Sequence, residues 1–304
     1  MGTLRGMGRR ERNATPREGS NRAEKLAAQR ARSADDAVAA RRPFEGLAAE
    51  CDLVALRQFV PSATAPLAVQ GSSRDVRLAT VLPGASFALV REESDGPVGY
   101  AALQTSVRPE DPAAALAGSA RFAADTAPGE ALAEPTDAVP SEVLDTAAAL
   151  EITVHSDFDW WLAGETDAQT RQLVEHANSL ITPAARLDLG ADGVGAPWWA
   201  DTGSKAHLRW VHPAPEDELM AALARVHAAG GLTVGEGSRF AGSFRADGLL
   251  IPVFDLDRES HPDEWVPGTV ELAKRLAEAL ADDSELTAAQ RRSRDGLRGR
   301  QVSI

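Results

Sequence analysis

Residues 21–42 lack the apolar side chains that a helix needs to join a hydrophobic core. The segment is rich in helix-forming residues, yet Leu26 and Val38 are its only large apolar side chains, so it has no continuous apolar stripe to bury. The glycines and the proline before it favour coil. We therefore expect a disordered or partly helical basic arm over residues 1–42, and a globular body that starts near Pro43.

The body alternates short strand-like and helix-like segments. Strand patterns occur at 76–82, 87–91, 98–105, 150–157, 186–189, 197–200 and 207–211, and helix patterns at 52–60, 109–125, 166–181, 215–231 and 269–281. A hairpin is expected where 239–257 turns at Ala246-Asp247-Gly248, because Asp-Gly favours tight turns. The pattern predicts an α+β fold with antiparallel or mixed sheets and flanking helices.

A possible internal duplication lies within this body. The tripeptide Pro-Glu-Asp follows a strand and precedes a helix at Pro109 and again at Pro215. The order of the neighbouring elements is also similar, although a tripeptide match is a weak repeat signal. We expect two tandem, related α+β units at 43–181 and 182–283, followed by a basic C-terminal tail at 284–304.

Charge is segregated along the chain. The whole chain has a net charge of -13, but residues 1–42 carry 11 Lys and Arg against 5 Asp and Glu. Residues 285–304 carry 5 against 2, which leaves the acidic body between them at -22. Two basic ends therefore flank an acidic centre, and such ends suit anionic partners.

Cysteine use and hydropathy favour the cytoplasm. Cys51 is the only cysteine, so neither an intrachain disulfide nor a thiolate metal cluster is possible. The longest apolar run is far shorter than the about 20 residues of a membrane span. The N-terminus also lacks the apolar region of a secretory signal. We expect a cytoplasmic protein without a membrane span.

Acidic residues after two predicted strands are the candidate metal ligands. Asp255, Asp257 and Glu259 alternate after one strand, and oxygen-rich clusters of this kind can bind Mg²⁺ or Ca²⁺. The spacing is not that of an EF-hand. Solvated loop acids are the simpler explanation of the pattern in so acidic a body.

Other catalytic or ligand-binding features are weaker. Cys51 stands beside Asp52, which would raise its pKa and favours a buried, unreactive thiol. Ser204, next to Lys205, lacks a nucleophile elbow. No cofactor is predicted, because the chain has no dinucleotide fingerprint, phosphate-binding loop or paired-cysteine motif. Trp198 and Trp199 are a possible ligand surface if one of them is exposed, although burial of both is the simpler expectation.

The basic arm is the most informative functional feature. Arginines among small polar residues suit phosphate binding, because a guanidinium pairs bidentately with phosphate. The candidate anion-binding residues are Arg9, Arg10, Arg12, Arg17, Arg22, Lys25, Arg30, Arg32, Arg41 and Arg42. RNA or the ribosome is favoured over a lipid surface, since the arm has little apolar surface to insert. A solubilising tail, or an arm that docks on its own acidic body, is the alternative.

Three segments resemble an uncharacterised actinobacterial family of unknown function. They are RPFEGLAAECDLVALRQFVPSATAPL, APWWADTG and FAGSFRADGLLIPVFDL, and the resemblance covers residue 43 to about residue 283. Some members are named as related to the preprotein translocase, but this chain has neither a Walker-type ATP site nor clustered cysteines. The resemblance implies a fold boundary and no activity.

These observations favour a non-catalytic cytoplasmic binding or adaptor protein whose basic ends engage an anionic partner. A divalent-metal-dependent enzyme that uses Asp255 and Asp257 is one alternative. A secretion-associated accessory protein is another. No particular protein partner is indicated.

Overall fold

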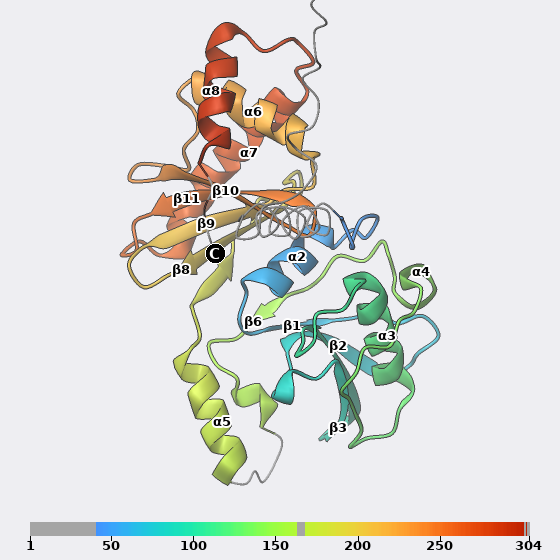
Figure 1. The fold of residues 1–304 in the computed structure, drawn as a ribbon. Helices are drawn as coiled ribbons and strands as arrows, with labels where there is room; N and C mark the ends of the chain where they lie inside the picture. The colour runs from blue at the N-terminus through green and yellow to red at the C-terminus, as the bar shows by residue number, and fades with distance from the viewer. Residues whose placement is uncertain (1–40, 163–167, 301, 303–304) are drawn as a thin grey trace, which may run out of the picture.

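The structure is a computed structural model that describes residues 41–162, 168–300 and 302. Figure 1 shows two β-sheets with the helix α2 (Glu50–Gln58) between them and further helices on their outer faces. The described residues form seven α-helices and two sheets, which confirms the predicted α+β fold. None of these helices is both long and apolar enough to cross a membrane.

The first sheet is mixed and has the strand order β5-β3-β4-β2-β1-β6. Its strands are β1 (Ala63–Pro66), β2 (Asp75–Val81), β3 (Ala88–Glu93), β4 (Gly96–Gln104), β5 (Ala131–Leu132) and β6 (Thr153–Val154). Strands β3 and β4 pair antiparallel, whereas β4 lies parallel to β2 on its other side. The segment expected as a strand at 150–157 contributes only the two-residue edge strand β6.

Two different layers cover the first sheet. Helix α3 (Pro112–Asp125) lies on one face and begins at Asp111, whose carboxylate accepts hydrogen bonds from the N–H groups of Ala113 and Ala114. It packs so closely that a Cβ at Gly99 would lie 2.3 Å from the Ala123 carbonyl oxygen. The short helix α4 (Pro140–Val143) packs beside α3.

An aromatic and ionic cluster covers the opposite face of that sheet. The rings of Trp160 and Tyr100 stack with centroids 6.0 Å apart, and Arg91 donates to the Trp160 carbonyl oxygen over 3.0 Å. The Tyr100 hydroxyl donates to Glu93 over 2.6 Å. Burial, together with this hydrogen bond to a carboxylate, raises the pKa of Tyr100. The cluster fixes the segment around Trp160 and Trp161 against the sheet.

The second sheet is fully antiparallel, with the order β10-β11-β9-β8-β7. Its strands are β7 (Ala184–Arg186), β8 (Ala196–Asp201), β9 (Ala206–Val211), β10 (Arg239–Ala246) and β11 (Leu249–Leu256). The predicted hairpin turn is confirmed, with Asp247 and Gly248 at φ values of 46° and 77°. These values are typical of a two-residue hairpin turn, which accounts for the Asp-Gly pair.

Helices α6 (Glu216–Ala228) and α7 (Val266–Leu280) form a second hydrophobic core with the second sheet. Both were expected from their apolar periodicity. The predicted helix after residue 166 is present as α5 (Ala168–Ser179), but most of its apolar face is uncovered. Val174 is buried, whereas Leu173 and Leu180 are exposed.

Helix α2 belongs to a core shared by both sheets. Its side chains Leu53, Val54 and Leu56 are buried in one cluster with residues of β4, α3 and the second sheet. Its C-terminal end also carries a buried ion pair. The Arg57 guanidinium donates to both carboxylate oxygens of Asp247, over 2.6 and 2.8 Å, and the two side chains are 8% and 5% exposed. The β10–β11 turn is thereby fixed to α2.

The last twenty residues are not the tail that the sequence suggested. They contain the helix α8 (Ala288–Arg298), which packs against α6 and buries Leu297. Beyond it, the backbone of residues 300 and 302 pairs with Ser243 of β10, with both hydrogen bonds at 3.1 Å. A Cβ at Gly242 would lie 2.5 Å from the Arg300 carbonyl oxygen, so glycine permits this approach.

The topology does not confirm an internal duplication. The first sheet is mixed and the second is antiparallel. The predicted strands at 150–157 and 249–256, which would correspond in a duplication, also differ: β6 has two residues at a sheet edge, whereas β11 has eight residues inside the other sheet. Duplication therefore stays a sequence-based hypothesis.

We predict that Arg57→Ala lowers the free energy of unfolding by about 3–5 kcal/mol, because it leaves the Asp247 carboxylate buried without its cation. Urea denaturation monitored by tryptophan fluorescence would measure this. Arg186→Ala is the matched control, since Arg186 also pairs with α2 through Asp52 but is more exposed; its cost should be about 1 kcal/mol or less. An equal loss of unfolding free energy in the two variants would contradict a stabilising role of the buried Arg57–Asp247 pair.

Candidate functional site

Most of the predicted anion-binding residues lie outside the described residues. They are Arg9, Arg10, Arg12, Arg17, Arg22, Lys25, Arg30 and Arg32. Arg42 is described and is already engaged, because it donates to both carboxylate oxygens of Glu50 over 2.9 and 2.6 Å. This hydrogen-bonded pairing raises the pKa of the Arg42 guanidinium. Arg42 therefore anchors the start of the body on α2, whereas Arg41 is exposed beside a hollow of about 300 Å³ that Arg108 also lines.

Asp255, the first predicted metal ligand, is paired with two cationic side chains and lies beside a histidine. It accepts hydrogen bonds from Lys205 Nζ at 2.6 Å and Arg239 Nη2 at 2.8 Å, and His207 Nε2 lies 3.4 Å from its other oxygen. His207 and Arg239 stand opposite Asp255 on β9 and β10. Burial alone would raise the pKa of Asp255, but the hydrogen bonds from Lys205 and Arg239 outweigh it and lower the pKa.

The structure does not bring the three predicted metal ligands together. Asp257 and Glu259 are exposed, and Asp257 accepts a hydrogen bond from the Glu259 backbone N–H over 3.0 Å. Among the described residues, no three His, Cys, Asp or Glu side chains are grouped closely enough to hold a metal ion. The cations that neutralise Asp255 come from the β8–β9 turn and from β10, which the local sequence pattern does not reveal.

Trp198 and Trp199 do not form a ligand surface. Their side chains point to opposite faces of β8, as strand alternation predicts, but both faces are covered. Trp198 is 0% exposed in the core shared with α2, and Trp199 is 8% exposed in the core beneath α6. Both tryptophans are buried because β8 lies in a sheet that is covered on both faces.

The Cys51 thiol is unsuited to nucleophilic chemistry. Burial, and the neighbouring carboxylates of Glu50 and Asp52, raise its pKa to about 12. A raised pKa of Cys51 is what the neighbouring Asp52 predicted from the sequence. Lys205, which the sequence places near Ser204, pairs with Asp255 instead of activating the serine.

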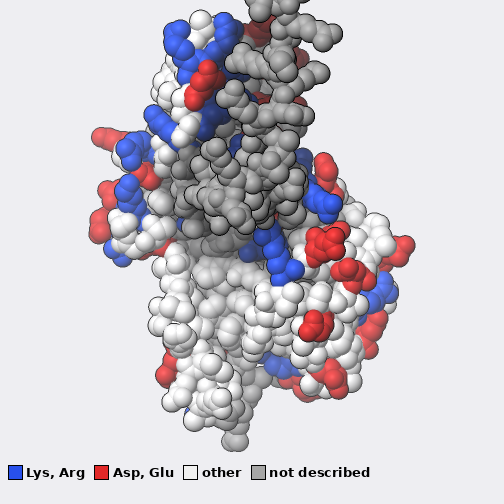
Figure 2. Space-filling view, viewed as in Figure 1, with Lys and Arg blue, Asp and Glu red and all other residues white. Residues whose placement is uncertain are grey.

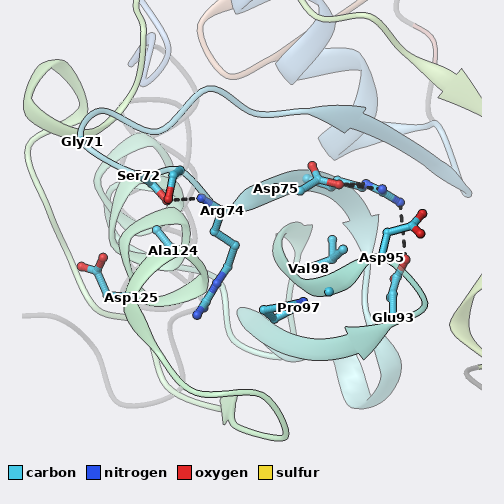
Figure 3. A pocket seen from close by; sticks show the side chains of 13 residues that line it. Gly71, Ser72, Arg74, Asp75, Glu93, Asp95, Pro97, Val98, Ala124 and Asp125 are labelled. Atoms are coloured by element: carbon cyan, nitrogen blue, oxygen red, sulfur yellow. Dashed lines mark hydrogen bonds and ion pairs between the residues drawn. The ribbon is translucent and has the colours of Figure 1, made fainter.

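A polar hollow of about 730 Å³ opens at the edge of the first sheet (Figure 3). Arg74 and Arg77 are its cationic side chains, but Arg74 donates to the carbonyl oxygens of Ala123 and Thr126 at the end of α3. Arg77 pairs with Asp75 at 2.6 Å. With further carboxylates around the rim, this hollow offers no positive charge for an anion, and its arginines serve the fold.

A basic groove lies between α6 and α8, and we call it the α8 groove. It is lined by His227, Ala228, Ala289, Arg292, Ser293, Gly296, Leu297 and Arg300, with a volume of about 410 Å³. Lys and Arg side chains gather at this end of the molecule, at the top of Figure 2. Arg292 and Arg300 are exposed, and within the described part of the chain neither guanidinium has a hydrogen-bond or ion-pair partner.

The groove has a defined shape because α8 is fixed at both ends. Thr287 and Gln290 form a capping box at its start. Near its end, Arg298 pairs with Asp217 at 2.6 Å. Between these points, His227 Nδ1 lies 3.0 Å from Ser293 Oγ. A Cβ at Gly296 would have open space around it, so the backbone there is accessible to a ligand.

From the sequence, Arg292 and Arg300 are predicted only as part of a basic C-terminal tail. The spacing Thr287-x-x-Gln290 is the signal that predicts a helix here. Given a helix, Arg292 and Gly296 are four residues apart and share a face. Arg300 follows just after the helix and completes that side of the groove.

A family profile matches residues 43–304, which is most of the chain. The chain belongs to DUF5926, a family of unknown function. The DUF5926 match begins where the body was expected to start, and it extends past residue 283 to include α8. No characterised protein and no solved structure shows significant similarity to the chain.

We predict that about 5 mM Mg²⁺, Mn²⁺ or Ca²⁺ leaves the thermal unfolding midpoint unchanged relative to NaCl of equal ionic strength, although this concentration exceeds the dissociation constants of weak protein Ca²⁺ sites. The physical reason is that Lys205 and Arg239 already donate to Asp255 Oδ2, and their positive charges repel a metal ion. Asp255→Asn is the matched variant. Stabilisation by a metal that disappears in Asp255→Asn would contradict this prediction and favour the metal-dependent enzyme.

Proposed function

We propose that this DUF5926 protein is a non-catalytic, cytoplasmic binding or adaptor protein whose basic ends hold an anionic partner, with RNA or the ribosome favoured. The observation that carries the proposal is the pair of exposed guanidinium groups, Arg292 and Arg300, on one groove. Most other arginines described above are engaged by carboxylates or backbone carbonyls. An arginine without a partner keeps its donors available for a phosphate.

The residues that line the α8 groove support a phosphodiester backbone as the ligand. Arg292 and Arg300 line the groove on either side of Gly296, where the backbone is open to solvent. Arginine recognises phosphate through two parallel N–H donors. Two such sites along one groove suit successive phosphates of a single strand better than a single small anion.

The charge of the rest of the chain limits where such a partner can bind. Residues 43–284 carry a net charge of -22, whereas both ends of the sequence are basic. A polyanion is repelled by the acidic body and attracted by the ends. We infer that the N-terminal residues 1–42 and the α8 groove act on the same partner, and that binding weakens steeply with salt.

We predict that the full chain binds a fluorescein-labelled 20-nucleotide oligouridine with a dissociation constant of about 10⁻⁶–10⁻⁴ M at physiological salt. Replacing both groove arginines, as Arg292→Gln with Arg300→Gln, should reduce the slope of log K against log salt by about 1.4, since each lost phosphate contact to a single strand removes about 0.7. Fluorescence anisotropy across a salt series measures both quantities.

The matched control removes the same charge elsewhere, as Arg77→Gln with Arg258→Gln. These side chains pair with Asp75 and Asp201 in the folded protein, so the control should keep the wild-type slope. A second test variant, with Gln at positions 9, 10 and 12, separates the contribution of the N-terminus from that of the groove. The proposal fails if the wild-type chain does not bind the oligonucleotide, or if the groove variant and the control behave alike.

A further inference from the structure

A mostly apolar cavity of about 400 Å³ lies between α7 and the loop that joins β7 to β8. It is separate from the α8 groove, and its volume lies within the range of about 300–1,000 Å³ that is typical of small-molecule sites. Leu189, Val194, Val270, Ala273, Ala277 and Leu280 supply apolar walls, and Trp210 and His212 lie at the β9 side.

The loop wall is held in place by backbone interactions. Trp210 donates from its indole Nε1 to the Val194 carbonyl oxygen over 3.1 Å. Gly195, at a φ of 86°, approaches β9 so closely that a Cβ would lie 2.4 Å from the Val211 carbonyl oxygen. The wall of the cavity is therefore fixed by contacts with the loop backbone. Val194 is 47% exposed, which leaves an apolar side chain at the edge of the opening.

His212 is the one buried polar side chain that lines this cavity among the described residues. It is 4% exposed, and its Nδ1 accepts a hydrogen bond from the Ala214 backbone N–H over 3.1 Å. In a neutral imidazole the proton must then be on Nε2. Within the described part of the chain, Nε2 has no hydrogen-bond partner, and the protein does not fully enclose it. Since His212 lines the cavity, this N–H is available to a molecule bound there.

The charge around the cavity favours an uncharged ligand. Burial lowers the pKa of His212 to about 4, so the imidazole is neutral at physiological pH. Asp192 and Lys274 also line the cavity, and Lys274 pairs with Glu271 at 2.7 Å. The lining thus presents one carboxylate, and its one ammonium group is already paired with Glu271, which disfavours an anionic molecule.

We propose that this cavity is a binding site for a small, uncharged, largely apolar molecule that carries a hydrogen-bond acceptor, which accepts from His212 Nε2. The apolar walls hold the body of the ligand, and the imidazole N–H of His212 fixes its orientation. This inference does not rest on the proposed polyanion binding, because it uses other residues and another surface.

Benzamide is a suitable probe, since it combines an uncharged ring with a carbonyl acceptor. Toluene lacks the acceptor, and benzoate adds a negative charge. We expect benzamide to bind the full chain with a dissociation constant of about 1 mM, in line with its few non-hydrogen atoms, and to shift the indole N–H signal of Trp210 in ¹H–¹⁵N spectra. Toluene and benzoate should each bind about threefold to tenfold more weakly, which corresponds to one net hydrogen bond in the case of toluene.

Two variants test the location and the donor. Ala273→Leu fills part of the cavity and should weaken benzamide binding at least fivefold, because the ligand then buries less apolar surface. Ala168→Leu, on the exposed start of α5, should not change benzamide binding. His212→Asn keeps an acceptor for the Ala214 N–H, but it shortens the side chain and should remove the preference for benzamide over toluene. Thermal unfolding confirms that each variant is folded.

Three results would overturn the inference. They are the absence of benzamide binding to the wild-type chain at millimolar concentration, binding that Ala273→Leu leaves unchanged, and a preference for benzamide over toluene that survives in His212→Asn. A folded His212→Asn variant with equal affinity for both probes, together with weak binding to Ala273→Leu, would support both the site and the role of Nε2.

Discussion

The structure depends on the burial of α2 between two sheets. Leu53, Val54 and Leu56 contribute to a core that includes residues of both sheets, so neither half buries its inner face without this helix. The buried pair of Arg57 and Asp247 adds a constraint that apolar packing does not supply, because it fixes the end of α2 to one turn. Breaking such a pair is costly, which makes it a strong determinant of how the two sheets are arranged.

The sequence predicted those parts of the fold that local signals specify. The β10–β11 turn follows from Asp247-Gly248, and α6 follows from its apolar period. Helix α8 was missed because Leu297 is its only buried side chain, so periodicity gives almost no signal. The predicted metal site at Asp255 failed to form a cluster for a different reason. Its neighbours are set by strand pairing, and its two cationic partners, Lys205 in the β8–β9 turn and Arg239 on β10, are 50 and 16 residues away in the sequence.

The α8 groove and the cavity beside α7 differ in charge and shape, and so suit different kinds of ligand. Among the described residues, Arg292 and Arg300 have donors without partners at one end of the molecule, where Figure 2 shows basic side chains together. His212 leaves one donor inside an apolar cavity beside α7. The first arrangement suits a charged polymer held by several weak contacts, and the second suits one small molecule held by burial. The two sites can therefore act independently on the same chain.

The most direct test of the central claim is sedimentation through sucrose gradients of a lysate from the native host. The wild-type chain is compared with a full-length variant that carries Gln at positions 9, 10, 12, 292 and 300, with and without ribonuclease and at low and high salt. The account predicts that the wild-type chain migrates with ribosomes or RNA, and that ribonuclease, high salt or the five substitutions return it to the top. A wild-type chain that stays at the top under every condition would contradict a polyanion-binding function.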